Sequence, residues 1–163
     1  MIRKVRIQDA EAICQIYNYY IENSNYTFDT DPRDLHQVVS QIESVTDKTP
    51  YFVFENEGCI EGFCYVHPWK EKAAYARTYE VTVYLHPTAT GKGLGKLLMQ
   101  KLIEASRALD VHALIACITE ENEKSFKLFE NLGFKQVSSF TEVGQKFGRW
   151  LGVVDYELVL SSF

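Results

Sequence analysis

The sequence predicts an α/β (α+β) fold in which helices pack against one mixed β-sheet, in a single domain of residues 1–163. Strand-like and helix-like patterns alternate along the whole chain, without internal repeats, low-complexity tracts or a segment composed like an interdomain linker. Hydrophobic residues make up 46% of the 163 positions and aromatic residues 13%, which is enough to build one packed core.

The N-terminal quarter is expected to form a strand over residues 2–7 and then two helices. Helical spacing of apolar residues predicts the first helix from Ala12, Ile13, Ile16, Tyr17, Tyr20 and Ile21. The segment 23–30 is polar with embedded aromatic residues and is expected to form a loop. Asp31 and Pro32 predict the start of the second helix, because Asp caps free amides and Pro suits the first helical position. The apolar face of this helix is expected to be Leu35, Val38, Val39 and Ile42.

Three strands are expected in the middle of the chain, over residues 51–55, 60–66 and 78–85. The first two are separated by a Glu-Gly turn, and the loop 67–76 precedes the third. The third strand alternates and is rich in β-branched residues, and Pro87 ends it.

A glycine-rich loop at 91–95 then leads into a third helix. The apolar face of that helix is expected to be Leu94, Leu97, Leu98, Leu102 and Ala105. Such a loop leaves backbone amides free to hold an anion, and the helix dipole and nearby lysines favour the same ligand. The segment therefore predicts a pyrophosphate site, with a simple helix-capping turn as the alternative. The spacing matches neither the nucleotide P-loop nor the dinucleotide-binding motif.

The C-terminal third is expected to contain a strand over 113–118 and a helix over 122–132, which a following glycine ends. Closing strands are expected over 134–140 and 153–160, linked by the loop 144–150.

Composition excludes several classes of protein. The net charge of −5 argues against nucleic acid as a partner. The four cysteines form no CxxC pair and lie in apolar stretches, so we expect reduced, buried side chains. The first residues do not have the composition of a signal peptide, and no stretch approaches the length of a membrane span. We therefore expect a cytoplasmic protein without membrane association.

Several segments together resemble one family. YEVTVYLHPTATGKGLGKLLMQKLI followed by NEKSFKLFENLGF is similar to the GNAT family of N-acetyltransferases. IYNYYIENSNYTFDT, PWKEKAAY, TYEVTVY and VGQKFGRW resemble its phosphinothricin and methionine sulfoximine acetyltransferase branch. The resemblance implies a strongly twisted mixed sheet that splays between two parallel strands, here residues 78–85 and 113–118, often at a β-bulge. It also implies a homodimer.

The co-substrate implied by the resemblance is acetyl-CoA, with no metal. Its pantetheine arm would pair with the third strand and its pyrophosphate would lie on the glycine loop. The implied coenzyme residues are Val81, Val83, Tyr84, Leu85, Thr90, Gly91, Lys92, Gly93, Leu94, Gly95, Lys96, Asn122, Ser125 and Phe129. Two positions depart from the family pattern: Thr90 stands where Gln or Arg is usual, and Phe129 where many relatives have a Tyr proposed to protonate the departing thiolate.

The resemblance assigns the general base to Glu80, acting through a water on the substrate ammonium, in a direct transfer within a ternary complex. A backbone N–H near Val81 would meet the oxyanion. The implied substrate is the α-amino group of a small amino-acid analogue of the phosphinothricin, methionine sulfoximine or methionine sulfone type.

A substrate carboxylate calls for a cation beside aromatic walls. The candidates are Phe28, Trp69, Lys72, Tyr75, Lys146, Phe147 and Arg149, with Lys70, Arg77 and Trp150 as further residues of the same kind. The histidines at 67, 86 and 112 have no recognisable partner and are interpreted as structural. Three alternatives stay open from the sequence: another small amine or a protein amine as substrate, a non-catalytic acyl-CoA sensor, and a nucleotide-binding regulator.

Overall fold

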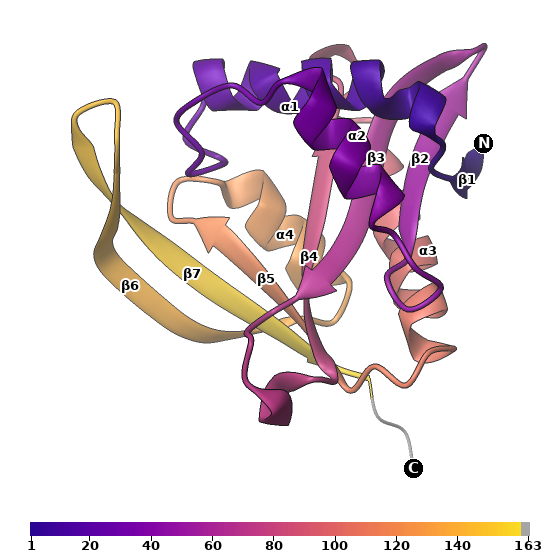
Figure 1. The fold of residues 1–163 in the computed structure, drawn as a ribbon. Coiled ribbons are helices and arrows are strands. Elements are labelled where there is room, and N and C mark those ends of the chain that lie inside the picture. The colour runs from indigo at the N-terminus through magenta and orange to yellow at the C-terminus, as the bar shows by residue number, and fades with distance from the viewer. Residues whose placement is uncertain (161–163) are drawn as a thin grey trace.

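The computed structural model describes residues 1–160 and has the mixed sheet that the sequence predicts, in the order β1-β2-β3-β4-β5-β7-β6 (Figure 1). The predicted domain runs to residue 163, and its last three residues lie outside the described part. Only β4 and β5 are parallel neighbours in this part of the chain. The strands are β1 (Ile2–Lys4), β2 (Tyr51–Asn56), β3 (Cys59–Pro68), β4 (Thr78–Leu85), β5 (Ala113–Thr119), β6 (Lys135–Lys146) and β7 (Arg149–Val159). The helices are α1 (Ala10–Asn23), α2 (Leu35–Glu43), α3 (Leu94–Arg107) and α4 (Glu123–Asn131), with short 3-10 turns η1 (Ile7–Asp9), η2 (Ala73–Tyr75) and η3 (Pro87–Ala89).

Helices cover both faces of the sheet, so the core has two layers. In β2, Val53 faces α1 and α2, whereas its neighbour Phe52 faces α3, as the two-residue period of a strand requires. The layer between the sheet and helices α1 and α2 also holds Phe63 of β3, and the layer between the sheet and α3 holds Leu98 of α3. In the predicted apolar faces, Leu35 and Leu97 are about half exposed instead of buried. None of the described helices is long and apolar enough to cross a membrane.

The predicted splay between β4 and β5 is confirmed. The two strands pair only from Thr78 with Ala113 to Glu80 with Ile115, and then diverge (Figure 1). The separation needs no bulge in β4, because its register with β3 is unbroken along the strand. One edge of β4 beyond Glu80 is therefore left open, which creates the space for a site.

The start of α2 differs from the prediction. The helix begins at Leu35, and Asp34 is its N-cap in place of Asp31. The Asp34 carboxylate accepts a hydrogen bond from the Gln37 amide (2.8 Å), while the Gln37 side chain accepts one from the Asp34 amide (2.9 Å). This reciprocal capping box explains why the helix starts three residues later than the Asp-Pro pair suggests.

The predicted loop over residues 144–150 is wrong. β6 runs through Lys146 and β7 starts at Arg149, so only two residues form the turn of a long hairpin. Both turn residues, Phe147 (φ 53°) and Gly148 (φ 70°), have the left-handed backbone that such hairpin turns require. The hairpin projects away from the body of the sheet (Figure 1).

Candidate active site

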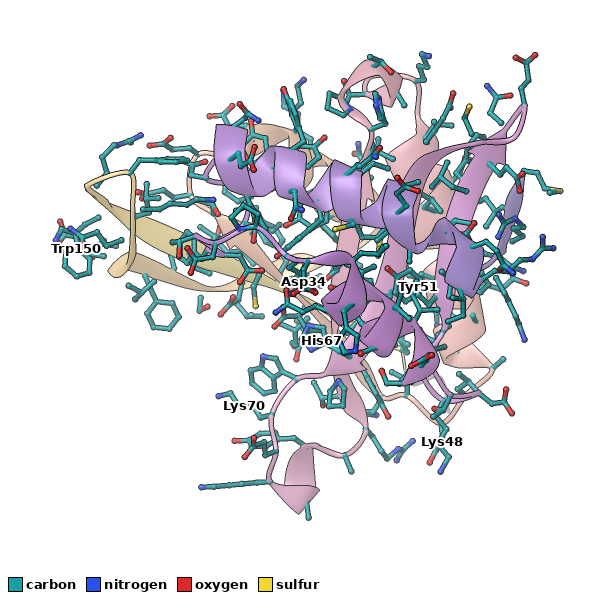
Figure 2. The ribbon with its side chains drawn as sticks, turned by 45° about the horizontal axis from the view of Figure 1, so that its top comes forward. Asp34, Lys48, Tyr51, His67, Lys70 and Trp150 are labelled. Atoms are coloured by element: carbon teal, nitrogen blue, oxygen red, sulfur yellow. The ribbon has the colours of Figure 1, made fainter. Side chains whose placement is uncertain are left out.

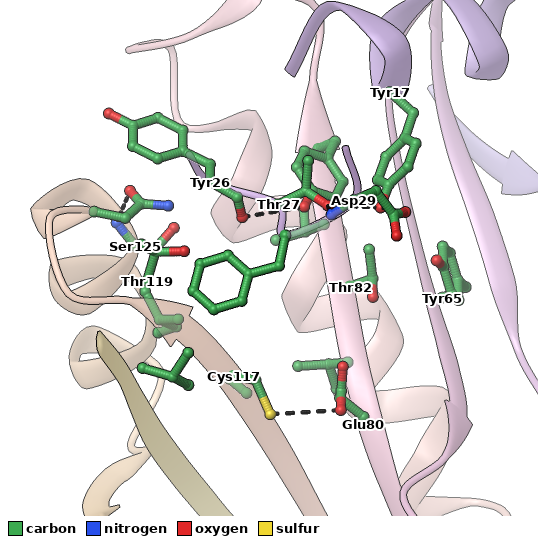
Figure 3. A pocket seen from close by; sticks show the side chains of 18 of the residues that line it. Tyr17, Tyr26, Thr27, Asp29, Tyr65, Glu80, Thr82, Cys117, Thr119 and Ser125 are labelled. Atoms are coloured by element: carbon green, nitrogen blue, oxygen red, sulfur yellow. Dashed lines mark hydrogen bonds between the residues drawn. The ribbon is translucent and has the colours of Figure 1, made fainter. Parts of the chain in front are cut away.

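A cavity of about 340 Å³ occupies the split between β4 and β5, under the loop that joins α1 to α2 (Figure 3). Residues of both diverging strands, of α4 and of the α1–α2 loop contribute to its walls. Its polar and charged lining residues include Tyr17, Asp29, Arg33, His67, Glu80 and Cys117. No group of three or more His, Cys, Asp or Glu side chains among residues 1–160 is arranged to hold a metal ion.

Glu80 lies at the point where the split opens, since it forms the last parallel rung with β5. One carboxylate oxygen, Oε2, is 3.3 Å from Nε2 of His67, and the other, Oε1, accepts a hydrogen bond from Sγ of Cys117 at 3.4 Å (Figure 3). Its side chain is 28% exposed. The carboxylate is thus held between two side chains and still faces the cavity, where a substrate proton can reach it.

His67 is a site residue that the sequence interpretation missed. It stands directly opposite Glu80 in the antiparallel register of β3 and β4. Its Nδ1 is 3.1 Å from the Pro68 carbonyl oxygen, so both ring nitrogens face oxygen acceptors, an arrangement that the doubly protonated imidazolium satisfies. The hydrogen bond to Glu80 accordingly raises the pKa of His67 above its ordinary value. The predicted strand bounds, 60–66 and 78–85, left His67 in the loop, and counting outward from their ends would have placed Cys64 opposite Glu80.

Cys117 corrects the expectation that every cysteine is buried. All four cysteines are free thiols, but Cys59 and Cys117 are exposed, and Cys117 opens onto the cavity. Partial enclosure and the negative charges of Glu80 and Asp155 raise the pKa of the Cys117 thiol. The thiol therefore stays protonated and donates to Glu80.

The α1–α2 loop forms the roof of the cavity and is held from several elements. Nζ of Lys146, near the end of β6, donates to the Thr27 carbonyl at 2.8 Å. Thr119 at the end of β5 donates to the Asn25 carbonyl, also at 2.8 Å. Burial lowers the pKa of Lys146, whose side chain acts as a clamp under the loop and does not line the cavity.

A tyrosine network closes the cavity below the α1–α2 loop. The Tyr17 hydroxyl hydrogen-bonds to Thr27 Oγ1 at 2.8 Å and donates to the carboxylate of Asp29 (Figure 3). Its ring meets that of Tyr84 edge-on. Burial is the main cause that raises the pKa of both Tyr17 and Tyr84, so both hydroxyls are neutral donors.

The opposite side of the cavity suits an extended arm. Beyond Glu80, the backbone groups of β4 that point away from β3 have no β5 partner in the described chain. Val81, Val83 and Tyr84 line the cavity along this open edge. The last carbonyl of the strand is already occupied, because Tyr20 donates to Leu85 O at 2.6 Å. An extended ligand that pairs as an added strand fits the open edge of β4 between Glu80 and Leu85.

The glycine loop fits a pyrophosphate. Gly91 (φ 77°) and Gly93 (φ 81°) have left-handed backbones, and Gly93 is the N-cap of α3. The first bond of the helix runs from Leu97 N to Gly93 O, so the amides before Leu97 point out of the helix end. Lys92 and Lys96 are exposed beside them, whereas Leu94 and Gly95 are buried. The Thr90 hydroxyl donates to Pro87 O at 3.3 Å.

The start of α4 forms a further wall of the cavity. Asn122 caps the helix by accepting from the Ser125 amide at 3.3 Å, and both residues line the cavity (Figure 3). Phe129 also reaches the cavity and is otherwise buried edge-on against Phe134. Its ring carries no group that can protonate a leaving thiolate.

The residues predicted for the substrate are dispersed. Phe28 lines the cavity, but the other six do not. Trp69 and Tyr75 pack edge-on in the loop after β3, with Lys70 over both rings and Lys72 exposed beside them. Phe147 is exposed in the hairpin turn, and Arg149 pairs with Glu121. Figure 2 shows Lys70 and Trp150 on separate projections, one on the loop and one on the hairpin.

Comparison with known proteins gives a consistent family. The GNAT acetyltransferase domain matches residues 2–154. Phosphinothricin N-acetyltransferase of Streptomyces viridochromogenes is 34% identical over 91% of this chain and 81% of its own. L-methionine sulfoximine/L-methionine sulfone acetyltransferase of Salmonella typhimurium is 33% identical over 94% of this chain and 91% of its own.

A solved structure shares the whole fold. Salmonella typhimurium yncA, determined with its cofactor acetyl-CoA, superposes with a TM-score of 0.97 at 30% identity. The match covers 100% of this chain and 95% of the other. In that relative, acetyl-CoA is therefore bound by a chain with nearly the same backbone fold.

Proposed function

The chain belongs to the GNAT family and is an N-acetyltransferase, and we propose that it transfers the acetyl group of acetyl-CoA to the α-amino group of a small amino-acid analogue. The relatives named for phosphinothricin and for methionine sulfoximine or sulfone support this substrate class. The observation that carries the proposal is Glu80, which is held by His67 and Cys117 where the split between β4 and β5 opens.

In the proposed reaction, both substrates are present together and Glu80 is the general base. It receives a proton from the substrate ammonium, directly or through a water, and leaves a neutral amine. Bound acetyl-CoA would supply the thioester, and the neutral amine would attack its carbonyl carbon. The C–S bond would break after the C–N bond has formed, and the second proton that the nitrogen loses would pass to the departing coenzyme A thiolate. Open N–H groups of β4 near Val81 are the proposed donors to the oxygen that gains charge. A thiol with a pKa of roughly 8.5 leaves without a strong acid, which suits the Phe129 position.

Several groups of this chain are proposed to hold acetyl-CoA. The amides and lysines of the glycine loop would bind the pyrophosphate, and the open edge of β4 would pair with the pantetheine arm. Asn122, Ser125 and Phe129 would line the arm from α4.

The homodimer and the cytoplasmic location also belong to this proposal. The β6–β7 hairpin supports the first, because six of its large apolar side chains are half exposed or more, and four of these lie within residues 140–150, around the turn: Phe140, Val143, Phe147 and Trp150. Such a cluster on a projecting element is typical of a protein contact. A contact of this kind would also account for aromatic residues of the hairpin that lie away from the cavity.

The test is release of free thiol from acetyl-CoA with phosphinothricin, methionine sulfoximine, methionine sulfone, polyamines and peptide N-termini. We expect turnover with the amino-acid analogues, and a fall of about 10²- to 10⁴-fold in kcat/KM for Glu80→Gln. Glu104→Gln, on the exposed surface of α3, is the matched control. Full turnover of Glu80→Gln across the pH range would exclude Glu80 as the base, and turnover confined to polyamines or peptides would change the substrate class.

A further inference from the structure

The cavity has one permanent cation among its described lining residues, Arg33 of the α1–α2 loop. The cations predicted from sequence are placed elsewhere. Lys146 is buried under the loop and bonded to Thr27 O, and Arg149 lies outside the cavity. An anionic group that enters the cavity therefore has Arg33 as its permanent counter-charge.

The backbone of Arg33 is fixed to α1 by a reciprocal pair of hydrogen bonds. The Arg33 amide donates to Asn18 Oδ1 at 2.9 Å, and Asn18 Nδ2 donates to the Arg33 carbonyl at 2.9 Å. The Cys14 thiol donates to the same carbonyl at 3.3 Å. An irregular loop segment is thus held in one register against a helix, which positions the side chain at the cavity.

The guanidinium is oriented and retains free donors. It lies over the ring of Tyr17, 4.7 Å from the centroid, and donates a hydrogen bond to Gln41 (3.4 Å). It also forms a salt bridge of 3.3 Å with Asp29, a carboxylate that lines the same cavity and accepts a hydrogen bond from the Tyr17 hydroxyl as well. Arginine carries five N–H donors in a rigid fork, so these two bonds leave donors for a ligand. The side chain is 33% exposed, which is consistent with access from the cavity.

We propose that Arg33 binds the α-carboxylate of the amino-acid substrate. The inference rests on the proposed function, because it takes Glu80 as the group that faces the amine. Glu80 and Arg33 line the same cavity, Glu80 on β4 and Arg33 on the roof loop, and therefore present a carboxylate and a cation to one ligand. A zwitterion matches this arrangement, with its ammonium at Glu80 and its carboxylate in the arginine fork.

The test combines a change in the substrate, from acid to carboxamide, with substitutions of Arg33. Binding of L-methionine sulfone and of its carboxamide, which keeps the amine and loses the negative charge, is measured by calorimetry on the full chain saturated with coenzyme A. In the unmodified protein the acid is expected to bind about 10- to 100-fold more tightly than the amide. In Arg33→Gln the preference is expected to fall below about threefold, with amide binding unchanged, and Arg33→Lys is expected to lie between. Lys48→Gln removes one exposed positive charge outside the cavity and is the matched control (Figure 2).

Two outcomes overturn the proposal: an undiminished preference for the acid in Arg33→Gln, or an equal loss of acid and amide binding, which would make Arg33 a structural residue of the loop. The same proteins are assayed for thiol release. Arg33-dependent binding of the acid without any thiol release would support the carboxylate site and refute the proposed function. Thiol release with equal use of acid and amide by the unmodified protein would support the proposed function and refute the carboxylate site.

Discussion

The glycine loop gives a prediction in which two neighbouring glycines respond with opposite signs to the same substitution. Gly93 has φ 81° and ψ 7°, and a Cβ there would meet nothing within 4 Å. The cost of Gly93→Ala is therefore purely conformational, about 1–2 kcal/mol for a residue with a side chain in the left-handed region. For a chain of this size, the melting temperature should fall by about 2–8 °C.

Gly95, two residues later, lies inside the first turn of α3. A Cβ there would make ordinary contacts with Leu128 (3.5 Å) and Leu85 (3.8 Å). Ala is favoured over Gly in a helix by about 0.8–1 kcal/mol, so Gly95→Ala should raise the melting temperature by about 2–4 °C. Gly93→Asn is the matched control, since Asn tolerates the left-handed region better than Ala and should destabilise less.

The assay is scanning calorimetry of the protein without coenzyme, followed by titration with coenzyme A. If Gly93→Ala relieves its strain by leaving the left-handed region, the neighbouring amides turn away and coenzyme binding weakens more than in Gly93→Asn. Melting temperatures of Gly93→Ala and Gly95→Ala that shift in the same direction would refute the reasoning. Unchanged coenzyme binding in Gly93→Ala would mean that the alanine keeps the left-handed backbone and that the neighbouring amides stay in place.

Much of the fold can be predicted from the sequence, because it depends on local patterns. The bounds predicted for β4, residues 78–85, are those of the structure, since a run of alternating and β-branched residues ends at Pro87. The start of α2 shows where local signals compete. Asp31 and Asp34 are both acceptable caps, and the reciprocal bond from Gln37 decides between them.

The β6–β7 hairpin could not be predicted for a different physical reason. β6 is exposed along most of its length, so no buried face imposes alternation on its sequence. Its turn begins with Phe147, a residue that rarely adopts positive φ, in place of the usual Asn or Asp. The polar and glycine-containing segment therefore has the composition of a loop, and its pairing is visible only in three dimensions.

The residues of the candidate site likewise differ in how far the sequence predicts them. Glu80 follows from the family resemblance. The pairing of His67 with Glu80 depends on β3 continuing through Pro68, two residues beyond its predicted end, so the predicted bounds do not give it. Arg33 could not be predicted either, because its place depends on a loop that is folded over the cavity by distant groups. The bond from Lys146 to Thr27, for example, joins positions 119 residues apart. No pattern near Arg33 carries that information.

Two further predictions concern the cap of α2 and the pair beside the base. Asp34→Ala should cost about 1 kcal/mol and lower the melting temperature by about 2–4 °C, whereas Asp31→Ala, outside the cap, should leave it unchanged; equal effects would contradict the capping box. For His67→Gln the effect on stability depends on pH. Because the bond to Glu80 raises the pKa of His67, the pair contributes fully below the unfolded pKa of about 6.5 and is lost as pH rises through the folded value. His67 and Glu80 are both partly exposed, so the contribution is less than about 1 kcal/mol, and the difference in melting temperature from the unmodified protein should be largest near about pH 6 and shrink toward about pH 9. Arg33 also faces the imidazole and stays charged throughout this range, so a difference that stays constant with pH would mean that His67 is packed as a neutral ring.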